Sequence, residues 1–382
     1  MDRLYLDNAA TSHPKPEIVY QAVDAALRSG GSAGRGSHQQ GIGADRAVFA
    51  TRELLAQLFG VTSSERFIFT ANATQALNLA IFGLVNSGDR VVTTSMEHNA
   101  VTRPLQALQE QGVETVKVAA DAHTGVVVTA DIQSACLAAP TRLLVINHAS
   151  NVFGSLQPLD DLGHWCRQQG IILLVDGSQT AGLIPIHLDE LAIDLFAAPG
   201  HKGLLGPQGT GFLYIHEGIE LRPLIYGGTG ANSHSSQLPE ILPERFESGT
   251  FNIPGLTGLG AALRFLLEIG VEQIHAREAQ LVRRLINGLT QINSVRLYGP
   301  SDQQARGSAV SFTLKGIDPA AAGYLLDQRG IAVRTGLHCS PDSHRSCGTF
   351  PEGTIRVSPG FFTTEAHIDC FINEVGMLKP TL

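Results

Sequence analysis

One lysine of this chain lies in a glycine-rich stretch, "APGHKGLLGPQGTG", which runs from residue 198 to residue 211. Five glycines and two prolines surround Lys202 there. A surface lysine needs no such neighbours, whereas a lysine that bonds covalently to a bulky cofactor needs open backbone around it, which glycine provides. This stretch alone leaves both interpretations open.

Three further polar side chains follow apolar, strand-like runs. Asp176 ends "IILLVD" and is either a helix N-cap or a functional anion; taken alone, the cap is slightly favoured. Thr74 follows "RFIFT" at the start of a helical pattern, where first-turn N–H groups form a phosphate cradle, although capping by Asn72 or Thr74 explains the pattern equally well. His98 follows "RVVTT", and a lone histidine is more often structural than catalytic.

The shared position of these side chains is more informative than any one of them. If the strands are parallel, all three and Lys202 lie beyond the same edge of a sheet, where ligands bind in open α/β folds. A helix-start phosphate site, an aromatic ring, an acid and a lysine together describe a site for pyridoxal phosphate. The lysine would bond to this cofactor, the acid would keep its pyridine nitrogen protonated, and the imidazole would stack on the ring and move protons.

Short apolar runs alternating with helical patterns must position these residues. The runs hardly alternate with polar residues, so both faces of the sheet are expected to be covered. This predicts an α/β fold with a mostly parallel seven-stranded sheet flanked by helices. The expected strands are 66–70, 90–94, 115–119, 142–147, 171–176, 194–198 and 211–215, and the expected helices are 73–85, 99–112, 129–138 and 159–169.

After about residue 255 the pattern changes to more helix and fewer strands, which predicts a smaller α+β domain. We expect a large cofactor-binding domain over 15–255, and a small domain over 256–382 together with residues 1–14. The Gly- and Ser-rich segment 29–43 lacks the ending of a phosphate loop and is interpreted as a mobile loop near the site mouth. The small domain is expected to contain helices 256–293, 318–329 and 364–377 and strands in "GSAVSFTLKG", "IAVRTG" and "TIRVS".

Composition excludes several classes of protein. The 382 residues are 43% hydrophobic and 16% charged, which is typical of a soluble globular protein. The net charge of −8, without a run of Lys or Arg, argues against nucleic-acid binding. No apolar run approaches the ~18 residues of a membrane span, and we expect no signal peptide. Five mostly scattered cysteines indicate a reducing compartment, which we take to be the cytoplasm.

The stretch "HCSPDSHRSCGTFP" admits three interpretations. His338, Cys339, His344 and Cys347 only loosely match zinc spacing, so we expect no metal. Cys339 and Cys347 could pair as a redox disulfide. Alternatively, Cys339 is a nucleophile, because it lies on a Gly-, Ser- and Pro-rich loop with His338 and Arg334 close by. A loop cysteine without a role would be a fair interpretation of this stretch alone.

Nine motifs along nearly the whole chain carry a family resemblance: "YLDNAATS", "NATQALNLA", "EHNA", "NHASNVFG", "VDGSQTAG", "GHKGLLGPQGTG", "ESGTFNIPGL", "VRTGLHCS" and "TIRVSPGFF". In them the chain resembles the class V aminotransferase group of fold-type I enzymes, which use pyridoxal phosphate. It is most similar to the branch of cysteine desulfurases and selenocysteine lyases. Nine motifs in the family's order are far more specific than a single glycine pattern.

The resemblance implies a role for each matching residue. Lys202 would form the Schiff base with the cofactor, Asp176 would pair with its pyridine nitrogen, and His98 would stack over its ring. Gln179 would bind the ring hydroxyl. The residues implied at the phosphate are Ala73, Thr74 and His201, with Ser178 assisting, and Thr250 from the neighbouring subunit of a homodimer.

The resemblance also implies a substrate site. Asn151 and Arg356 would bind the substrate carboxylate, for which an arginine fork is suited. Cys339 aligns with the nucleophile that receives sulfur. One departure is Pro199, where relatives usually carry Ser or Thr. Proline has neither a hydroxyl nor an N–H group, so one phosphate contact fewer is expected.

The activity that follows is that of a cysteine desulfurase. L-cysteine would become L-alanine, and its sulfur would pass to Cys339 as a persulfide and then to a protein acceptor, as in iron–sulfur cluster assembly. Alternatives with the same fold are a lyase for L-selenocysteine, an aminotransferase and an epimerase, from which Cys339 distinguishes a desulfurase. A regulatory protein that only binds the cofactor is a further alternative, against which the complete set of site residues argues.

Overall fold

A seven-stranded sheet lies at the centre of the computed structural model, which describes residues 3–34, 36–230, 234–301 and 306–379. Its strand order is β2-β8-β7-β6-β5-β3-β4. Strand β8 is antiparallel to both neighbours, and the other adjacent pairs are parallel, so the predicted mostly parallel sheet is confirmed. The strands are β2 (Phe67–Thr70), β3 (Arg90–Thr94), β4 (Glu114–Val118), β5 (Leu143–Asn147), β6 (Ile172–Asp176), β7 (Leu195–Pro199) and β8 (Gly211–Ile215).

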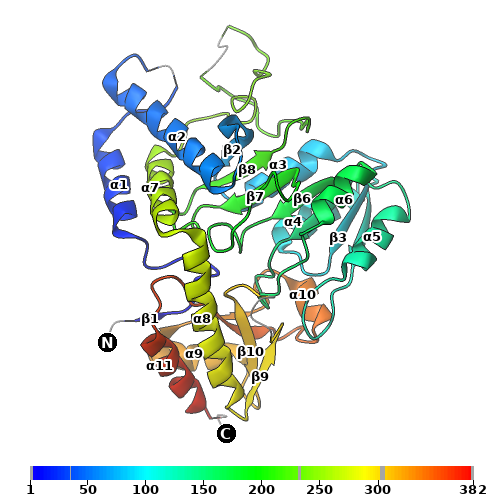
Figure 1. Ribbon diagram of the computed structural model, residues 1–382, viewed down its shortest axis with the longest axis vertical. Helices are drawn as coiled ribbons and strands as arrows, with labels where there is room; N and C mark the ends of the chain where they lie inside the picture. The colour runs from blue at the N-terminus through cyan, green and yellow to red at the C-terminus, as the bar shows by residue number, and fades with distance from the viewer. Residues whose placement is uncertain (1–2, 35, 231–233, 302–305, 380–382) are drawn as a thin grey trace.

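Helices cover both faces of this sheet (Figure 1). Successive residues of β5 point to opposite faces, so Leu144 and Ile146 join one apolar core and Leu143 and Val145 join another. The first core includes residues of α2, α5, α6 and α7, and the second includes residues of α3 and α4. These helices are α1 (Glu17–Ser29), α2 (Gln39–Leu58), α3 (Ala73–Leu84), α4 (Asn99–Gln109), α5 (Thr129–Leu137), α6 (Leu162–Gln169) and α7 (Ile253–Ile269).

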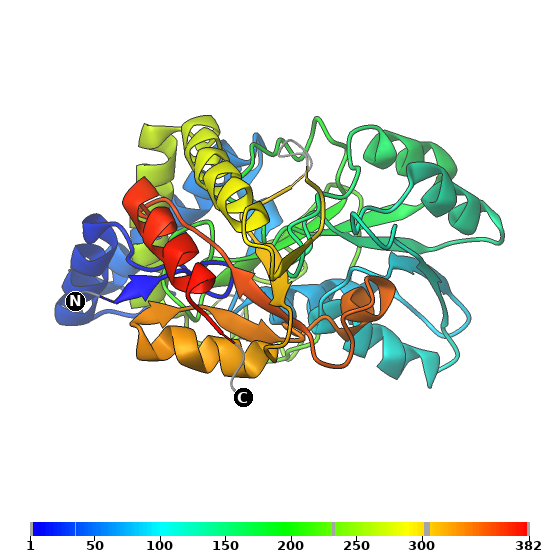
Figure 2. The same cartoon turned by 90° about the horizontal axis from the view of Figure 1, so that it is seen from below.

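The C-terminal part contains a four-stranded antiparallel sheet of order β12-β13-β10-β9, seen from below in Figure 2. It has its own apolar core, between this sheet and the helices α8, α9 and α11. Its elements are α8 (Val271–Thr290), β9 (Val295–Tyr298), β10 (Val310–Leu314), α9 (Pro319–Gln328), β12 (Arg334–Gly336), α10 (Pro341–Ser346), β13 (Thr354–Val357) and α11 (Glu365–Gly376).

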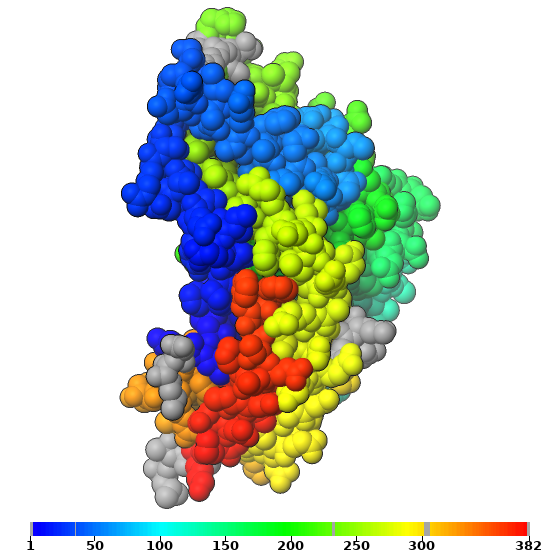
Figure 3. All heavy atoms as spheres, turned by 60° about the vertical axis from the view of Figure 1, so that its left-hand side comes forward, coloured from blue at the N-terminus to red at the C-terminus, as the bar shows by residue number. Residues whose placement is uncertain are grey.

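The N-terminal residues join the C-terminal part. Strand β1 (Leu4–Tyr5) pairs in parallel with β11 (Ile331–Ala332), and Asp7 forms a bridge with Ser358. Figure 3 shows this N-terminal segment in blue, next to the red C-terminal residues on one face of the molecule. The division into two domains at residue 255 stays a prediction.

The predicted single helix over 256–293 is wrong. Two helices, α7 and α8, meet there at Gly270, whose φ is 89°, a backbone conformation that glycine adopts without strain. Helix α7 packs on α1 and α2, whereas α8 packs on α11 and β9. Within the described ranges, no single helix is long and apolar enough to cross a membrane; α7 and α8 meet that test only as a pair, across an 83° bend.

Two smaller predictions also need correction. "IAVRTG" forms two short strands in different sheets, because β11 pairs with β1 whereas β12 pairs with β13. The segment 29–43 is not all loop, because α2 begins at Gln39 with the His38 side chain as its N-cap. Within that segment, Gly34 lies against Gly230.

Candidate active site

A cavity opens at the carboxyl edge of the large sheet. Strands β2, β3, β6 and β7 run in the same direction, so their C-terminal ends meet at this edge. The cavity contains about 540 Å³ of space and opens to solvent. It brings together most of the predicted site residues: Ala73, Thr74, His98, Asn151, Asp176, Ser178, Gln179, His201 and Lys202.

Lys202 lies in the tight loop after β7, and close packing of the backbone explains part of its glycine-rich setting. A Cβ atom on Gly203 would lie 2.5 Å from the Ala181 carbonyl oxygen, and one on Gly206 would lie 2.8 Å from that of Gly200. The glycines therefore serve the fold as well as access to the lysine. Burial lowers the pKa of Lys202 to about 8, and the negative charge of Asp176 opposes this shift.

Asp176 and His98 both line the cavity, but Asp176 is not the helix N-cap that the sequence also allowed, because a turn rather than a helix follows β6. The Asp176 carboxylate is 4% exposed and accepts the N–H of Ser178 at 2.9 Å. His98 is the N-cap of α4, where its Nδ1 accepts the N–H of Ala100 at 3.0 Å. Burial lowers the pKa of His98, and Asp176 opposes this. A helix cap therefore fixes His98, and a hydrogen bond within the turn after β6 fixes Asp176; both residues line the cavity.

The start of α3 and His201 form an end of the cavity that suits an anion. Asn72 is the N-cap, because its Oδ1 accepts the N–H of Gln75 at 2.9 Å. The N–H groups of Ala73 and Thr74 precede the first intrahelical bonds and are available to a ligand. His201 Nδ1 is buried and has no partner among the described residues. Burial lowers the pKa of His201 to about 4, so the ring is neutral at pH 7.

This donor set fits a phosphate-bearing pyridine aldehyde. Anion-binding N–H groups and an unpartnered histidine nitrogen lie at one end of the cavity, while a buried carboxylate and a lysine lie within it. Pro199, the last residue of β7, also lines the cavity and adds no donor. Gln179 Nε2 donates to the Ala9 carbonyl oxygen at 3.0 Å, which links the site to the N-terminal segment.

Cys339 lies at the surface of the short loop between β12 and α10. His338 and Cys339 have φ values of 49° and 60°, which non-glycine residues adopt at a cost of about 1–3 kcal/mol each. Asn151 holds this loop: its Nδ2 donates to the His338 carbonyl oxygen at 2.6 Å, and its Oδ1 accepts from Ser340 Oγ at 2.7 Å. The Cys339 carbonyl oxygen accepts the N–H of Asn99, next to His98, at 2.8 Å. The strained loop is thus anchored to the cavity.

Positive charge near Cys339 comes from Lys202 and Arg356, both of which interact electrostatically with its thiol. Burial holds the pKa of His338 well below its ordinary value, so this neighbour is neutral. Arg356 is 2% exposed; one of its terminal nitrogens donates to the Asn151 carbonyl oxygen and the other to Asp7, both at 2.8 Å. Asp7 also accepts from Arg334 Nε at 3.0 Å.

The other predicted residues lie elsewhere. Cys347 is a free, buried thiol in a cluster with Met96, Val152 and Phe153. Across the described part of the chain, no group of three or more His, Cys, Asp or Glu side chains could hold a metal ion. Thr250 is exposed in the segment before α7 and does not line the cavity of its own chain.

Three polar residues behind the site were not predicted from the sequence. Asp7 is the counter-ion of Arg356, Asn147 ends β5 beside Asp176, and Glu97 lies directly before His98. Each lies in one of the nine sequence motifs. Its link to the site depends on a partner from another segment of the chain, which the sequence does not show. One sequence feature could have indicated these residues: each is a polar residue near a strand end that is needed neither for a turn nor for a helix cap.

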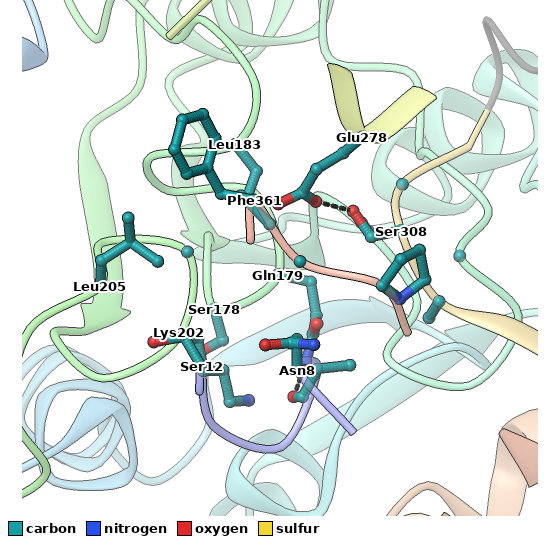
Figure 4. A pocket seen from close by; sticks show the side chains of 18 of the residues that line it. Asn8, Ser12, Ser178, Gln179, Leu183, Lys202, Leu205, Glu278, Ser308 and Phe361 are labelled. Atoms are coloured by element: carbon teal, nitrogen blue, oxygen red, sulfur yellow. Dashed lines mark hydrogen bonds between the residues drawn. The ribbon is translucent and has the colours of Figure 1, made fainter. Parts of the chain in front are cut away.

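A second cavity, of about 570 Å³, adjoins Lys202 and Gln179 (Figure 4). Its wall includes Leu183 and Phe361, and Glu278 faces it from α8. Ser308 Oγ donates to the Glu278 carboxyl group, and burial raises the pKa of that group to about 7. This cavity lies between the large sheet's loops and the C-terminal part.

Comparison with known proteins agrees with this geometry. The family model for class V aminotransferases matches residues 4–371, and the chain therefore belongs to this family. It is 33% identical over 375 residues to a probable cysteine desulfurase of Methanothermobacter thermautotrophicus, covering 96% of this chain and 92% of the relative. It is 35% identical over 376 residues to one of Halalkalibacterium halodurans, covering 96% and 90%. The apo structure of the cysteine desulfurase from Thermococcus onnurineus superposes with a TM-score of 0.91 at 30% identity, covering 98% of this chain and 94% of that one.

Proposed function

We propose that this chain is a pyridoxal-phosphate-dependent cysteine desulfurase, which converts L-cysteine to L-alanine and places the sulfur on Cys339 as a persulfide. The observation that carries the proposal is an exposed cysteine on a loop held by Asn151, which lines a cavity that contains a half-buried lysine, a carboxylate and an imidazole. The charge of Lys202 and Arg356 acts on that cysteine. An aminotransferase needs no thiol at this place.

The residues present fit the cofactor as follows. The N–H groups of Ala73 and Thr74 and the free Nδ1 of His201 would hold the phosphate, and Asp176 would hold the protonated pyridine nitrogen. When bound to Lys202, pyridoxal phosphate supplies an electron sink that makes the Cα proton of an amino acid acidic. His98 would cover one face of the ring, and Ser178 would hold the Asp176 carboxylate in place through its N–H group.

The chain's own groups would then move a proton and a sulfur atom. Lys202 Nζ, with a pKa of about 8, can hold the Cα proton near neutral pH. Arg356 and Asn151 would orient the substrate carboxylate. The Cys339 thiolate attacks the substrate sulfur; the substrate Cβ–S bond breaks, its electron pair stays with carbon, and that carbon takes up a proton. Cys339 is left as a persulfide and the product is alanine.

The first test replaces the nucleophile and measures both products. With L-cysteine and a reductant, the wild-type protein should release alanine and sulfide in equal amounts. Cys339→Ser should lose both by at least about 100-fold, because serine cannot accept sulfur. Cys370→Ser, at an exposed cysteine of α11, is the matched control and should behave as wild type.

Two results would contradict this proposal. Sulfide release by Cys339→Ser at the wild-type rate would remove Cys339 from the reaction. A coloured, cofactor-bearing wild-type protein that yields neither product would point to another amino acid, with transamination tested next. L-selenocysteine in place of L-cysteine, assayed with the same two variants, separates a preference for sulfur from one for selenium.

We further propose that the active form is a homodimer in which Thr250 reaches the phosphate site of the partner subunit. Gly249 pairs with Gly228, which brings Thr250 near the segment that carries Ile225 and Tyr226. Tyr226 is 73% exposed and Phe49 of α2 is 62% exposed, and Phe49 lines a surface hollow together with Phe251, the residue after Thr250. A second copy of this chain would cover that surface.

The dimer is tested by mass in solution and by cofactor affinity. Sedimentation should give twice the 40.6 kDa of one chain, and Tyr226→Asp should shift the mass to that of a monomer. Thr250→Ala should remain dimeric but bind pyridoxal phosphate about tenfold more weakly, as expected for one lost hydrogen bond to a charged group. A wild-type protein that stays monomeric at working concentration would exclude the dimer.

The exposed position of Cys339 suits transfer of the sulfur to a thiol of an acceptor protein, which we propose as the next step. That transfer returns Cys339 to its reduced form and requires reduced thiols on both proteins. A reducing compartment, the cytoplasm, supplies this condition. The test is transfer of radioactive sulfur from the loaded protein to a thiol-bearing acceptor, which Cys339→Ser should abolish.

A further inference from the structure

Glu97 is a buried carboxyl group directly behind the active-site cavity. It lies between β3 and α4, immediately before His98, and its side chain is 0% exposed. Its Oε1 accepts from Thr94 Oγ1 at 2.6 Å and from the backbone N–H of Asn147 at 3.2 Å. Glu97 therefore connects the end of β3 to the end of β5, where Asn147 lies opposite Asp176 in the sheet.

The other oxygen of this carboxyl group has no partner. Among the side chains that the structure describes, Glu97 Oε2 and Asn147 Oδ1 are both buried and both lack a hydrogen bond. The orientation of the Asn147 amide is fixed, because its Nδ2 donates to the Met96 carbonyl oxygen at 2.8 Å. Two buried acceptors without a donor, on residues already in contact, would each carry a substantial free-energy cost.

A proton on Glu97 Oε2 turns that atom into a donor, and Asn147 Oδ1 is the acceptor without a donor in the residue that Glu97 already contacts. Among the described residues, the groups that act on Glu97 include no cation: Thr94 and Asn147 are uncharged, and the charged group is the Asp176 carboxylate. Burial and Asp176 both raise the pKa of Glu97, to about 8, against the lowering effect of its hydrogen bonds.

We propose that Glu97 is a neutral carboxylic acid at physiological pH and acts as a positioning residue, fixing Asn147 and leaving Asp176 as the negative charge beneath the cavity. The effect on cofactor binding rests on the proposed function, whereas the first test of the Glu97 protonation state requires no catalytic activity. A second negative charge beside Asp176 would favour protonation of Asp176 itself and weaken its hold on a pyridinium group. The neutral acid keeps the three strand ends in register without competing for that proton.

The primary test is the pH dependence of stability in the isolated cofactor-bearing protein, compared with Glu97→Gln. Glutamine keeps the acceptor for Thr94 and offers an N–H to Asn147, but it cannot ionise. Since the folded pKa is raised above the ordinary 4.5, the folded state binds the extra proton between about pH 4.5 and pH 8. The wild-type protein should therefore lose stability relative to Glu97→Gln as pH rises through this window, by about tenfold in the folded-to-unfolded ratio per pH unit.

The control is Glu110→Gln, at an exposed glutamate where α4 ends, whose profile should run parallel to that of wild type. Parallel profiles for wild type and Glu97→Gln between pH 5 and pH 8 would overturn the proposal, because they would show that Glu97 is already ionised when the protein is folded. This comparison uses no substrate. Its failure is therefore distinct from failure of the desulfurase assay.

An infrared measurement does not depend on the folding of a variant. The wild-type protein in D₂O at pH 6 should show the carbonyl stretch of protonated carboxylic acids above the amide I band, with one component from Glu97 and one from Glu278, whose pKa is also raised. Thr94→Val removes a hydrogen bond that favours the ionised form, so it should move the disappearance of the Glu97 component to higher pH. Absence of the Glu97 component in the wild-type protein at pH 6 would overturn the proposal.

Affinity for the cofactor tests the positioning role itself. Glu97→Ala removes the contacts to both Thr94 and Asn147 and should weaken pyridoxal-phosphate binding by about tenfold or more, the effect of losing one to two such bonds. Glu97→Gln should restore most of that affinity. Equal weakening in both variants would show that the site needs a carboxylate at this place and would contradict a neutral Glu97.

Discussion

His201 shows how one buried atom can indicate what a site binds. His201 lines the cavity together with the residues that begin α3, and its buried Nδ1 has no partner in the described part of the chain. A neutral imidazole there is suited to contact a phosphate oxygen. Buried polar atoms without partners are uncommon in folded proteins, so a ligand is the economical explanation.

Replacing His201 with alanine should weaken binding of pyridoxal phosphate by about 10- to 100-fold, since hydrogen bonds to charged groups contribute about 1.5–3 kcal/mol. Binding of pyridoxal, which lacks the phosphate, should change less than about threefold. Titration of the protein by absorbance measures both affinities. If both fall equally, His201 contacts the ring rather than the phosphate.

That these candidate site residues lie together was predictable from the sequence, and the reason is topological. Lys202, Asp176, His98 and Thr74 each follow an apolar run, and parallel strands bring such positions to one edge without knowledge of packing. Glu97 and Asp7 were not predictable in this way. Their partners, Asn147 and Arg356, come from other strands, and only the folded chain shows that the side chains meet.

At the scale of elements, Gly270 separates two helices that the sequence presents as one. The apolar pattern continues through "LLEIGVEQIH", and a single glycine within such a pattern is ambiguous. Tertiary packing decides, because α7 belongs to the core beside the large sheet and α8 to the C-terminal core. The strands of the large sheet, in contrast, were predictable to within one residue at each end, since a buried strand appears in the sequence as a continuous apolar run.

Gly270→Ala should destabilise the protein by about 1–2 kcal/mol, because an alanine at φ 89° is strained even though no atom crowds its Cβ closely. Gly43→Ala is the matched control: Gly43 lies inside α2, and a Cβ there would meet nothing within 4 Å. That control should stabilise by about 0.5–1 kcal/mol. Urea unfolding measures both, and equal effects would contradict the assigned break.

At the scale of the whole molecule, Asp7 links separate parts of the chain. It lies in the N-terminal segment and is hydrogen-bonded to Arg356 of β13 and Arg334 of β12, both in the C-terminal sheet. Because Arg356 also donates to the Asn151 carbonyl oxygen, this ion pair connects the C-terminal sheet to the active-site cavity. Because Arg356 is almost wholly buried, water cannot take the place of Asp7 as its hydrogen-bond partner.

Asp7→Asn should lower stability by about 3 kcal/mol, since it leaves the buried Arg356 without its counter-charge. It should also change the KM for L-cysteine more than kcat, because Arg356 is the proposed carboxylate ligand. Asp24→Asn, at an exposed pair with Arg28, should change stability by less than about 0.5 kcal/mol. An Asp7→Asn protein as stable as wild type would show that Arg356 needs no anion.

The pairing of the two chain ends sets the order in which the protein can be completed during synthesis. Asn8 donates to the carbonyl oxygen of Ser358, 350 positions later, and Asp7 requires Arg356. At roughly 5–20 residues per second, a ribosome needs roughly 20–70 s to make the intervening chain. Throughout that interval Asp7 and Asn8 lack these two partners, while the large sheet can already form. The substrate site, which includes Cys339 and Arg356, is therefore completed later than the cofactor site, whose lining residues all come from the part of the chain that forms the large sheet.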